Sequence, residues 1–342
     1  MKTESLTLDG VDRGLVHALQ IDGRAPLRLV GEALGVSEST VARRYRRLRG
    51  AGVLRVVGAL NGGPLGHQAW TVRLRCTPDA ATAIAHALAA RPDTSYVHVL
   101  SGGTEISCSI RTGGAEDGGE LLLQRLPRSG RISSVSAHLL LDSHALPSSW
   151  AGPACLTPEQ IALLAPPPPA GGADGGGAAE VPVGPGDRPL FDLLARDGRA
   201  SHTELAAATG WSESTVRRRL GLLRRAGVLA FLVDVPPAAL GFRAEARLWM
   251  SVRPSGLRAV AAELAGHPEV SLVAHTTGPT NLLAAVNCRD SLDLARYLTT
   301  RIAALDAVRS IETAPVSRTV KRAGALLTLD RQIGPGMFTS YD

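Results

Sequence analysis

The sequence predicts an α+β fold made of two tandem units, each a helix-turn-helix (winged-helix-like) domain followed by a ferredoxin-like βαββαβ sensing domain. Three observations lead to this prediction. The chain repeats itself after a long shift, the first part of each repeat carries three short amphipathic helical patterns, and the remainder alternates strand and helix patterns.

The repeat is strongest where residues 22–54 align with residues 197–229 without a gap. By direct count, 19 of these 33 positions are identical. A second match, between residues 95–110 and 271–286, needs a slip of one residue. A period this long indicates duplicated domains and not a solenoid of short repeats.

The repeat and its interruption divide the chain into five segments. Residues 165–187 are rich in Pro and Gly and show no apolar periodicity, so they bury too little surface to order themselves, which predicts a linker. An ordered loop is the alternative for this stretch. The expected segments are helix-turn-helix domain 1 (5–56), sensing domain 1 (65–145), the linker (151–186), helix-turn-helix domain 2 (187–231) and sensing domain 2 (240–330).

Composition narrows the class of protein. The 342 residues suffice for several domains, and no run of eighteen apolar residues or signal-peptide pattern occurs, so we expect a cytoplasmic, nucleoid-associated protein with no membrane partner. The net charge of +6 suits a polyanionic partner. The four cysteines are scattered without metal-ligand spacing, which predicts reduced thiols, no metal site and no cofactor.

The first domain of each unit shows the signals of three helices. Ser201 and Glu204 form a predicted capping box at the start of a second helix. Ser37 and Ser212 are favourable N-caps for a third helix, which is expected to end near a glycine that can adopt a left-handed conformation. Such helices, with a turn before the third, are typical of a helix-turn-helix.

The third helix presents one basic face. On a helical wheel Val41, Tyr45 and Leu48 form the buried stripe, whereas Arg43 and Arg46 point to the opposite side. A solvated face is the ordinary explanation for surface arginines. Here the charge has one sign, follows the turn and occurs in both copies, which favours contact with double-stranded DNA.

These residues resemble the Lrp/AsnC family of transcription regulators. The shared pattern runs from an acidic-Arg pair (Asp12-Arg13 and Asp187-Arg188) through Asp-Gly-Arg and Gly-x-Ser-x-Ser-x-Val-x-x-Arg to Ala-Gly-Val-Leu in both copies. The resemblance implies a sequence-specific DNA-binding regulator whose sensing domain dimerises and senses amino acids. With the wheel, it predicts DNA contacts at Ser39, Thr40, Arg43, Arg44, Arg46, Arg47, Ser214, Thr215, Arg217, Arg218 and Arg219.

The sensing domain is predicted most clearly in the second copy. Its order, βαββαβ, is that of a ferredoxin-like domain. The expected strands cover residues 246–253, 270–277, 281–288 and 308–320, and the expected helices cover 257–267 and 291–305.

An effector site is expected at the turn between the second and third strands. The family resemblance places an effector pocket near this glycine-containing turn, and backbone amides and hydroxyls there suit an amino acid or another carboxylate. An ordinary hairpin turn explains the same residues. We expect the second copy to dominate, because a glutamate in the first would repel a carboxylate. The candidate residues are Thr276, Thr277, Gly278, Thr280, Asn281, Gly102, Thr104 and Glu105.

Two other functions compete with a specific regulator. Sirohaem decarboxylases have a similar paired architecture. Only His275 and Asn281 of this chain are weakly similar to the residues with which those enzymes bind the tetrapyrrole. No nucleophile, base and orienting group occur together, so we expect no enzyme. A nucleoid-associated protein of low sequence preference is the second alternative. In each case the tethered copies predict an internal pseudo-dimer, with further homo-oligomers of the chain.

Overall fold

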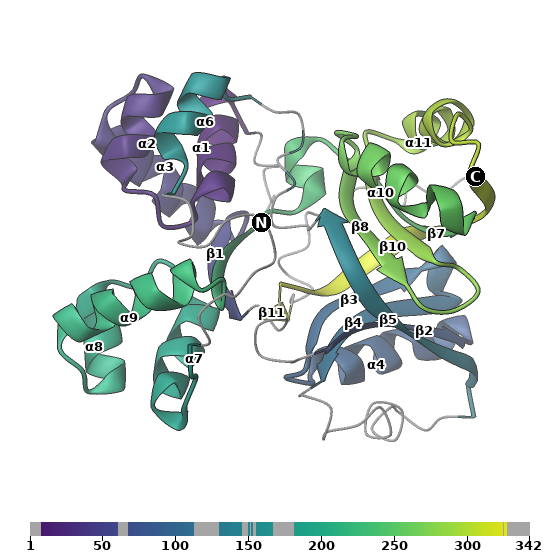
Figure 1. The fold of residues 1–342 in the computed structure, drawn as a ribbon, viewed down its shortest axis with the longest axis horizontal. Coiled ribbons are helices and arrows are strands. Elements are labelled where there is room, and N and C mark those ends of the chain that lie inside the picture. The colour runs from purple at the N-terminus through teal and green to yellow at the C-terminus, as the bar shows by residue number, and fades with distance from the viewer. Residues whose placement is uncertain are drawn as a thin grey trace.

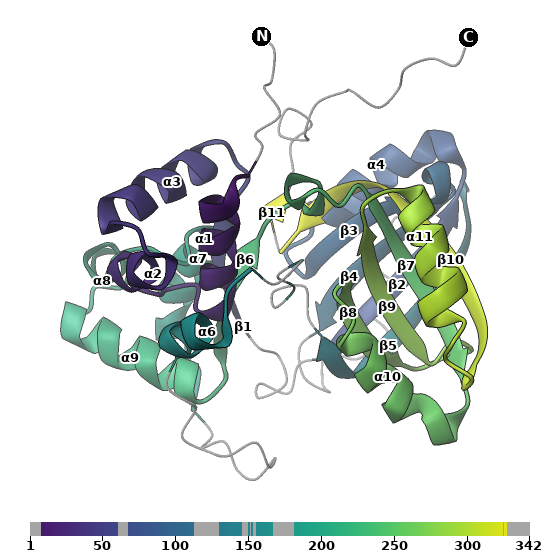
Figure 2. The same ribbon diagram turned by 90° about the horizontal axis from the view of Figure 1, so that it is seen from above.

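The computed structural model describes residues 8–60, 68–112, 130–145, 150, 152, 155–166, 181–323 and 325–326. Two layers lie side by side (Figure 1). One layer holds the two three-helix domains, and the other holds the strands of both sensing domains, with helices on their outer side (Figure 2). The predicted α+β fold with two tandem units is confirmed. None of the described helices is long and apolar enough to cross a membrane.

The two DNA-binding domains have the same elements in the same order. The first contains α1 (Gly10–Ile21), α2 (Leu27–Leu34), α3 (Glu38–Gly50) and strand β1 (Arg55–Leu60). The second contains α7 (Arg188–Arg196), α8 (His202–Thr209), α9 (Glu213–Arg225) and strand β6 (Leu229–Asp234).

The local sequence signals explain the ends and faces of these helices. The side chains of Ser37 and Ser212 accept hydrogen bonds from backbone amides of the first turn, as N-caps do. Ser201 and Glu204 form the expected capping box. The predicted stripe on α3 is buried, with Val41 and Leu48 fully inaccessible.

The segment predicted to be a linker contains a helix. Helix α6 (Pro158–Leu164) begins with a capping box at Thr157 and packs on the first DNA-binding domain, where Leu156 and Leu164 join its hydrophobic core. Assigning all of residues 151–186 to a linker was therefore wrong for this part. Apolar residues at helical spacing follow the N-cap, and they precede the Pro/Gly-rich stretch. Residues 167–180 lie outside the described part of the chain.

The sensing domains supply the strands. The first has β2 (Gln68–Cys76), α4 (Pro78–Ala89), β3 (Thr94–Leu100), β4 (Glu105–Thr112) and β5 (Ile132–Ala145); residues 113–129 lie outside the described part of the chain. The second has β7 (Ala244–Val252), α10 (Leu257–Ala265), β8 (Val270–Thr276), β9 (Leu282–Cys288), α11 (Ser291–Tyr297) and β10 (Val308–Arg322), with β11 (Ala325–Leu326) paired to β10. One turn of π-helix, Leu298–Ile302, continues α11.

The last long strand of each half is shared between both halves. The first part of β5 pairs with β2 of its own half, and its second part pairs with β8 of the other half. Strand β10 does the same with β7 and β3. The eight strands consequently form a closed hydrogen-bonded ring, in the order β10, β3, β4, β2, β5, β8, β9, β7 and back to β10.

The DNA-binding domains are also joined reciprocally. Strands β1 and β6 pair antiparallel, with Arg55 opposite Asp234 at one end of the register. The guanidinium of Arg24 donates to the carbonyls of Gly198 and Ala200 at 2.7 and 2.9 Å. Arg199 repeats this with the carbonyls of Gly23 and Ala25 at 2.7 and 3.0 Å.

The repeated Asp-Gly-Arg motif therefore holds the two halves together. Asp22 binds Arg224 and Asp197 binds Arg49 across the same interface, at 2.9 and 2.7 Å. A Cβ at Gly198 would collide with the backbone of β1, so only glycine permits this approach. In this motif the aspartate forms an ion pair, the glycine permits close backbone contact, and the arginine donates hydrogen bonds to carbonyls of the other half.

We expect Arg24→Ala to lower the free energy of unfolding by about 2–3 kcal/mol, because it leaves two carbonyls at the interface without their donor. Chemical denaturation of the full chain measures this. The control is Arg28→Ala, whose exposed ion pair with Glu32 should contribute less than about 1 kcal/mol. Equal losses of unfolding free energy in the two variants would contradict the role assigned to Arg24 at the interface.

Candidate DNA-binding surface and effector cavity

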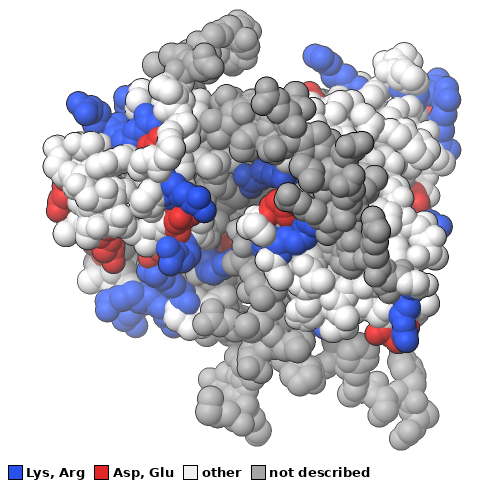
Figure 3. Space-filling model, turned by 90° about the horizontal axis from the view of Figure 1, so that it is seen from below, with Lys and Arg blue, Asp and Glu red and all other residues white. Residues whose placement is uncertain are grey.

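The recognition helices α3 and α9 lie at opposite ends of the DNA-binding pair (Figure 2). Each is held by its buried stripe, which turns the other face outward. Arg43 and Arg46 are exposed on α3, and Arg217 and Arg218 are exposed on α9. Figure 3 shows Lys and Arg side chains gathered over this layer on the face seen from below.

Three predicted DNA contacts are engaged inside the domains instead. Arg44 donates to Asp12 and Asp9 at 2.9 and 2.6 Å, and Arg47 donates to Asp12 at 2.5 Å. Arg219 forms two hydrogen bonds to Asp187, at 2.7 and 2.6 Å. Asp12 is fully buried, so these pairs hold α1 against α3.

Arg44 and Arg219 therefore have a structural role as partners of buried carboxylates, and DNA contact at these two positions stays a prediction. Each is one position after an arginine that points outward, so it lies on the flank of the basic face, where a neighbouring helix reaches it. Arg47 binds Asp12 and also contacts solvent, because its side chain remains 44% exposed.

The hydroxyl residues of the predicted surface gather at the helix starts. Ser39 and Thr40 lie 2.9 Å from the Ser37 hydroxyl, and Ser214 and Thr215 lie 2.8 and 2.9 Å from that of Ser212. Ser39 and Ser214 are exposed, whereas the two threonines are half-buried. DNA contact at the exposed arginines and serines stays a prediction.

The predicted effector turn of the second copy is engaged by the fold. The Asn281 side chain binds both backbone groups of Val252, at 2.8 and 2.9 Å. Thr276 donates to the Thr280 carbonyl, and the Thr277 hydroxyl accepts from the Leu139 amide. Asn281 is therefore not a free donor for a ligand carboxylate, contrary to our expectation.

The turn of the first copy also differs from expectation. Glu105 is buried and forms two hydrogen bonds with Arg73, at 2.7 and 3.0 Å. Its charge is balanced, so the repulsion predicted for a ligand carboxylate has no basis. Thr104 donates to the Ser101 carbonyl, and Gly102 adopts a positive φ of 69° and donates to the Ser317 hydroxyl. Effector binding at either turn stays a prediction.

A cavity, which we call the central cavity, lies between the two layers. Its volume is about 470 Å³, within the range of small-molecule sites. Residues of β1 and β6 form one wall, and inward-facing residues of both sensing domains form the other. Figure 3 shows a hollow between the layers with basic and acidic side chains at its rim.

Buried polar side chains line the central cavity. Arg247 lies 2.7 Å from the Nε2 atom of His98, and the Nδ1 atom of His98 lies 3.0 Å from the Thr319 hydroxyl. Because the guanidinium only donates, Nε2 accepts and Nδ1 carries the proton. Burial, followed by the charge of Arg247, keeps the pKa of His98 well below its usual value, so the imidazole is neutral. Burial also lowers the pKa of Arg247.

A second arginine in the cavity has unused hydrogen-bonding capacity. The Nη1 atom of Arg322 is buried and has no hydrogen-bond partner among the described residues, while its Nε atom lies 3.6 Å from Asp234. Arg55 also binds Asp234, so this carboxylate faces two cations. Arg111, the third arginine of the wall, donates to the Leu60 carbonyl. Three arginines therefore line the cavity, and one of their nitrogen atoms has no hydrogen-bond partner among the described residues.

Sequence reasoning missed these residues. It assigned no binding role to His98, Arg247 or Arg322. One signal was available: Arg247 interrupts an apolar strand, and a charge inside a buried strand indicates a partner or a ligand. Its partner His98 comes from the other half of the chain.

The comparisons with known proteins match two segments of the chain to one type of domain and a third segment to another. Residues 8–49 and 186–224 match the AsnC-type helix-turn-helix domain, and residues 245–326 match the Lrp/AsnC ligand binding domain. An HTH-type transcriptional regulator of Pyrococcus abyssi is 34% identical over 139 residues, which span 40% of this chain and 87% of the relative. The regulator FL11 of Pyrococcus horikoshii is 31% identical over 147 residues, or 43% and 97% of the two chains.

A solved structure with the paired architecture is also similar. The siroheme decarboxylase NirDL superposes with a TM-score of 0.60 at 14% sequence identity, covering 92% of this chain and 93% of its own. At this identity the likeness concerns the fold. The two regulators each correspond in length to less than half of the present chain, as expected for a tandem duplication.

We expect Arg219→Ala to lower the free energy of unfolding by about 3 kcal/mol at neutral pH, because it leaves the buried Asp187 carboxylate without its partner. Burial alone would raise the pKa of Asp187, but hydrogen bonds from Arg219 and the Gly184 amide outweigh burial and lower it. A lowered pKa stabilises the fold above the ordinary value of 3.8, and this stabilisation is lost as pH falls through the lowered pKa.

The difference in unfolding free energy between the wild type and Arg219→Ala should therefore become smaller below about pH 4. Denaturation at a series of pH values measures this difference. The control is Arg218→Ala, one residue away and exposed, which should change stability by less than about 0.5 kcal/mol. A difference that is independent of pH would contradict the ion pair.

Proposed function

The chain belongs to the Lrp/AsnC family of transcriptional regulators, and on this basis we propose that it recognises specific DNA sequences through α3 and α9 and responds to a carboxylate-bearing small molecule in the central cavity. It contains two DNA-binding domains and a ligand-binding domain of this family. Sequence-specific recognition and the identity and place of the effector are the proposed parts.

The observation that carries the DNA-binding proposal is the reciprocal docking of two recognition helices with outward basic faces. Arg24 and Arg199 fix the two domains in one orientation, so both helices address the same duplex together. Arginine reads guanine edges and phosphates through its planar donor fork. A pair of helices held in this way favours two half-sites on one DNA molecule.

The two faces differ, which makes the proposed recognition asymmetric. Arg46 on α3 stands where α9 has Gly221, and Arg217 on α9 stands where α3 has Ala42. Identical helices favour a palindrome, so this chain should prefer an imperfect one. Half-sites separated by a whole number of turns of about 10.5 base pairs fit such a pair.

The central cavity supports the effector proposal better than the two turns do. Polar side chains of the turns already bind the fold, whereas Arg322 retains a buried donor atom without a partner among the described residues. A ligand in the cavity contacts strands that carry the DNA-binding domains and strands of the sensing domains at once. Binding there would bias the arrangement of the two layers.

We expect Arg43→Ala to weaken protection of one half-site and Arg218→Ala to weaken the other, each by about 1–3 kcal/mol of binding free energy where a base contact is lost. Footprinting on the natural operator, found by genomic footprinting, measures both. Arg296→Ala, an exposed arginine on α11, is the control and should leave the footprint unchanged. Equal weakening of both half-sites by either variant would contradict the asymmetric arrangement.

The salt dependence of binding separates a specific regulator from a nucleoid protein. A ratio of specific to nonspecific affinity above about 10³ supports the regulator. Binding of all sequences with one affinity and one salt slope would favour the low-specificity alternative.

We expect Arg322→Gln to weaken binding of the effector about 10- to 100-fold, because a charge-assisted hydrogen bond in a buried cavity is lost. Calorimetric titration with amino acids and small carboxylates identifies the ligand and measures this change. The control is Arg243→Gln, an exposed arginine next to β7. If Thr277→Ala or Thr104→Ala abolishes effector binding and Arg322→Gln does not, the effector binds at the turns and not in the central cavity.

The same titration tests the enzymatic alternative. A NirDL structure in complex with an iron-uroporphyrin III analogue superposes with a TM-score of 0.58 at 15% identity, and a cavity rich in arginine suits a ligand with several carboxylates. A shift in the absorbance of an added iron porphyrin, lost in Arg322→Gln, followed by release of carbon dioxide, would favour a decarboxylase. Binding of DNA alone supports the regulator.

A further inference from the structure

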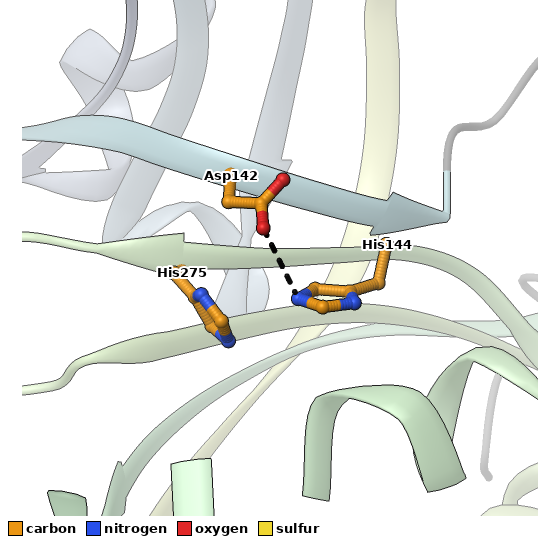
Figure 4. Close-up of side chains that lie close together, drawn as sticks. All are labelled: Asp142, His144 and His275. Carbon is orange, nitrogen blue, oxygen red and sulfur yellow. Dashed lines mark ion pairs between the residues drawn. The ribbon is translucent and has the colours of Figure 1, made fainter. Parts of the chain in front are cut away.

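Two histidines and an aspartate meet where the exchanged strand β5 crosses to the other half. Asp142 and His144 come from β5, and His275 comes from β8 (Figure 4). One ligand atom of each residue lies within 4.8 Å of those of the other two. The carboxylate of Asp142 is 3.6 Å from the Nε2 atom of His144, and the two imidazole rings are 4.7 Å apart between centroids.

The strand register makes this meeting a property of the exchange. Asp142 is the register partner of His275 in the antiparallel pairing of β5 with β8. Ser143, between Asp142 and His144, lines the central cavity, and the pairing of β5 with β8 has an irregularity at His144, between the register pairs of Ser143 and Ala145. The cluster lies on the opposite face of the sheet, next to the start of α10.

The histidines hold unused ligand atoms. The Nε2 atoms of His144 and His275 are both buried, and neither has a hydrogen-bond partner among the described residues. A buried imidazole nitrogen without a partner is unfavourable and normally finds a donor, an acceptor or a metal. Here two histidines with such nitrogens lie beside a carboxylate.

The matching seam in the other half lacks this chemistry. There Arg318 of β10 is the register partner of Val99 of β3, as Asp142 is of His275, and Val320 stands two residues further along. An arginine and two valines do not bind a cation. The ligand-type residues therefore belong to one seam only, and the shared fold does not require them.

We propose that Asp142, His144 and His275 bind a divalent transition-metal ion, with Zn²⁺ as its representative, and that the ion fastens β5 to β8. Two imidazoles and a carboxylate are a donor set that Zn²⁺ accepts, with a water completing the tetrahedron. Ligand atoms around such an ion are about 3.3 Å apart, so small side-chain rotations close the observed separations.

The four cysteines and the sequence spacing gave no indication of such a site, and we expected none. The ligands come from residues 142–144 and 275, more than a hundred positions apart, and only the exchange of β5 brings them together. Because the ion would bind the folded chain and not the unfolded one, its binding stabilises the exchanged arrangement.

The test uses the full chain, purified without a histidine tag and stripped of metal by a chelator. Calorimetric titration with Zn²⁺ should show one ion per chain at this site, and the melting temperature should rise on addition of Zn²⁺. Co²⁺ in place of Zn²⁺ should give visible absorption bands of a nitrogen- and oxygen-ligated ion. Each signal should be lost in His275→Ala and His144→Ala.

Asp142→Asn provides a variant that is expected to fold, because the side chain is exposed, and it should weaken Zn²⁺ binding about 10- to 100-fold. His86→Ala, a histidine on α4 outside the cluster, is the matched control and should bind as wild type does. Absence of Zn²⁺ binding in the wild type overturns the proposal. So does Zn²⁺ binding in His275→Ala and Asp142→Asn with the affinity of the wild type. Binding without a rise in melting temperature overturns the fastening role.

Discussion

The exchange of β5 and β10 between the two halves is the constraint on which the rest of the structure depends. Without the two long strands, the three remaining strands of each half would leave unpaired edges at β2 and β3 or at β7 and β8, and open edges are exposed to aggregation. Each long strand closes one edge of its own half and one of the other, so the ring of eight strands has all of its members paired. The duplication in one chain supplies both long strands at high effective concentration. The inner faces of the ring then bound a common interior.

The DNA-binding layer repeats this reciprocity with different chemistry. In the sensing layer, backbone hydrogen bonds join the halves; in the DNA-binding layer, the β1–β6 ribbon is reinforced by guanidinium groups that bind carbonyls of the opposite half. Two core clusters of this layer include residues from both halves, such as Val233 with the first domain and Leu60 with the second. Neither three-helix domain is therefore an independent body. The central cavity lies between these two joined layers, where a ligand contacts both.

The arginines of this chain divide into structural and exposed groups, although they share a helix. Arg44 and Arg219 satisfy buried carboxylates at the starts of the first helices of their domains, whereas Arg43 and Arg218, one position earlier, point outward. A rotation of 100° between neighbouring residues is sufficient to separate the two roles. The same holds on β5, where adjacent residues face the cavity and the histidine cluster. Residue type alone thus says little here, and the direction of each side chain decides its use.

The sequence by itself determined the duplication, the helix starts at Ser37 and Ser212, the buried stripe of the recognition helices and the strand order of the second sensing domain. These features rest on local periodicity and capping, which act over a few residues. Tertiary structure alone decided that Arg44 binds Asp12, that Asn281 binds the backbone of β7, that Arg247 meets His98, and that His144 faces His275. Most of these pairs join residues of different halves or distant elements. Their meeting depends on strand register and domain docking, which no local pattern specifies.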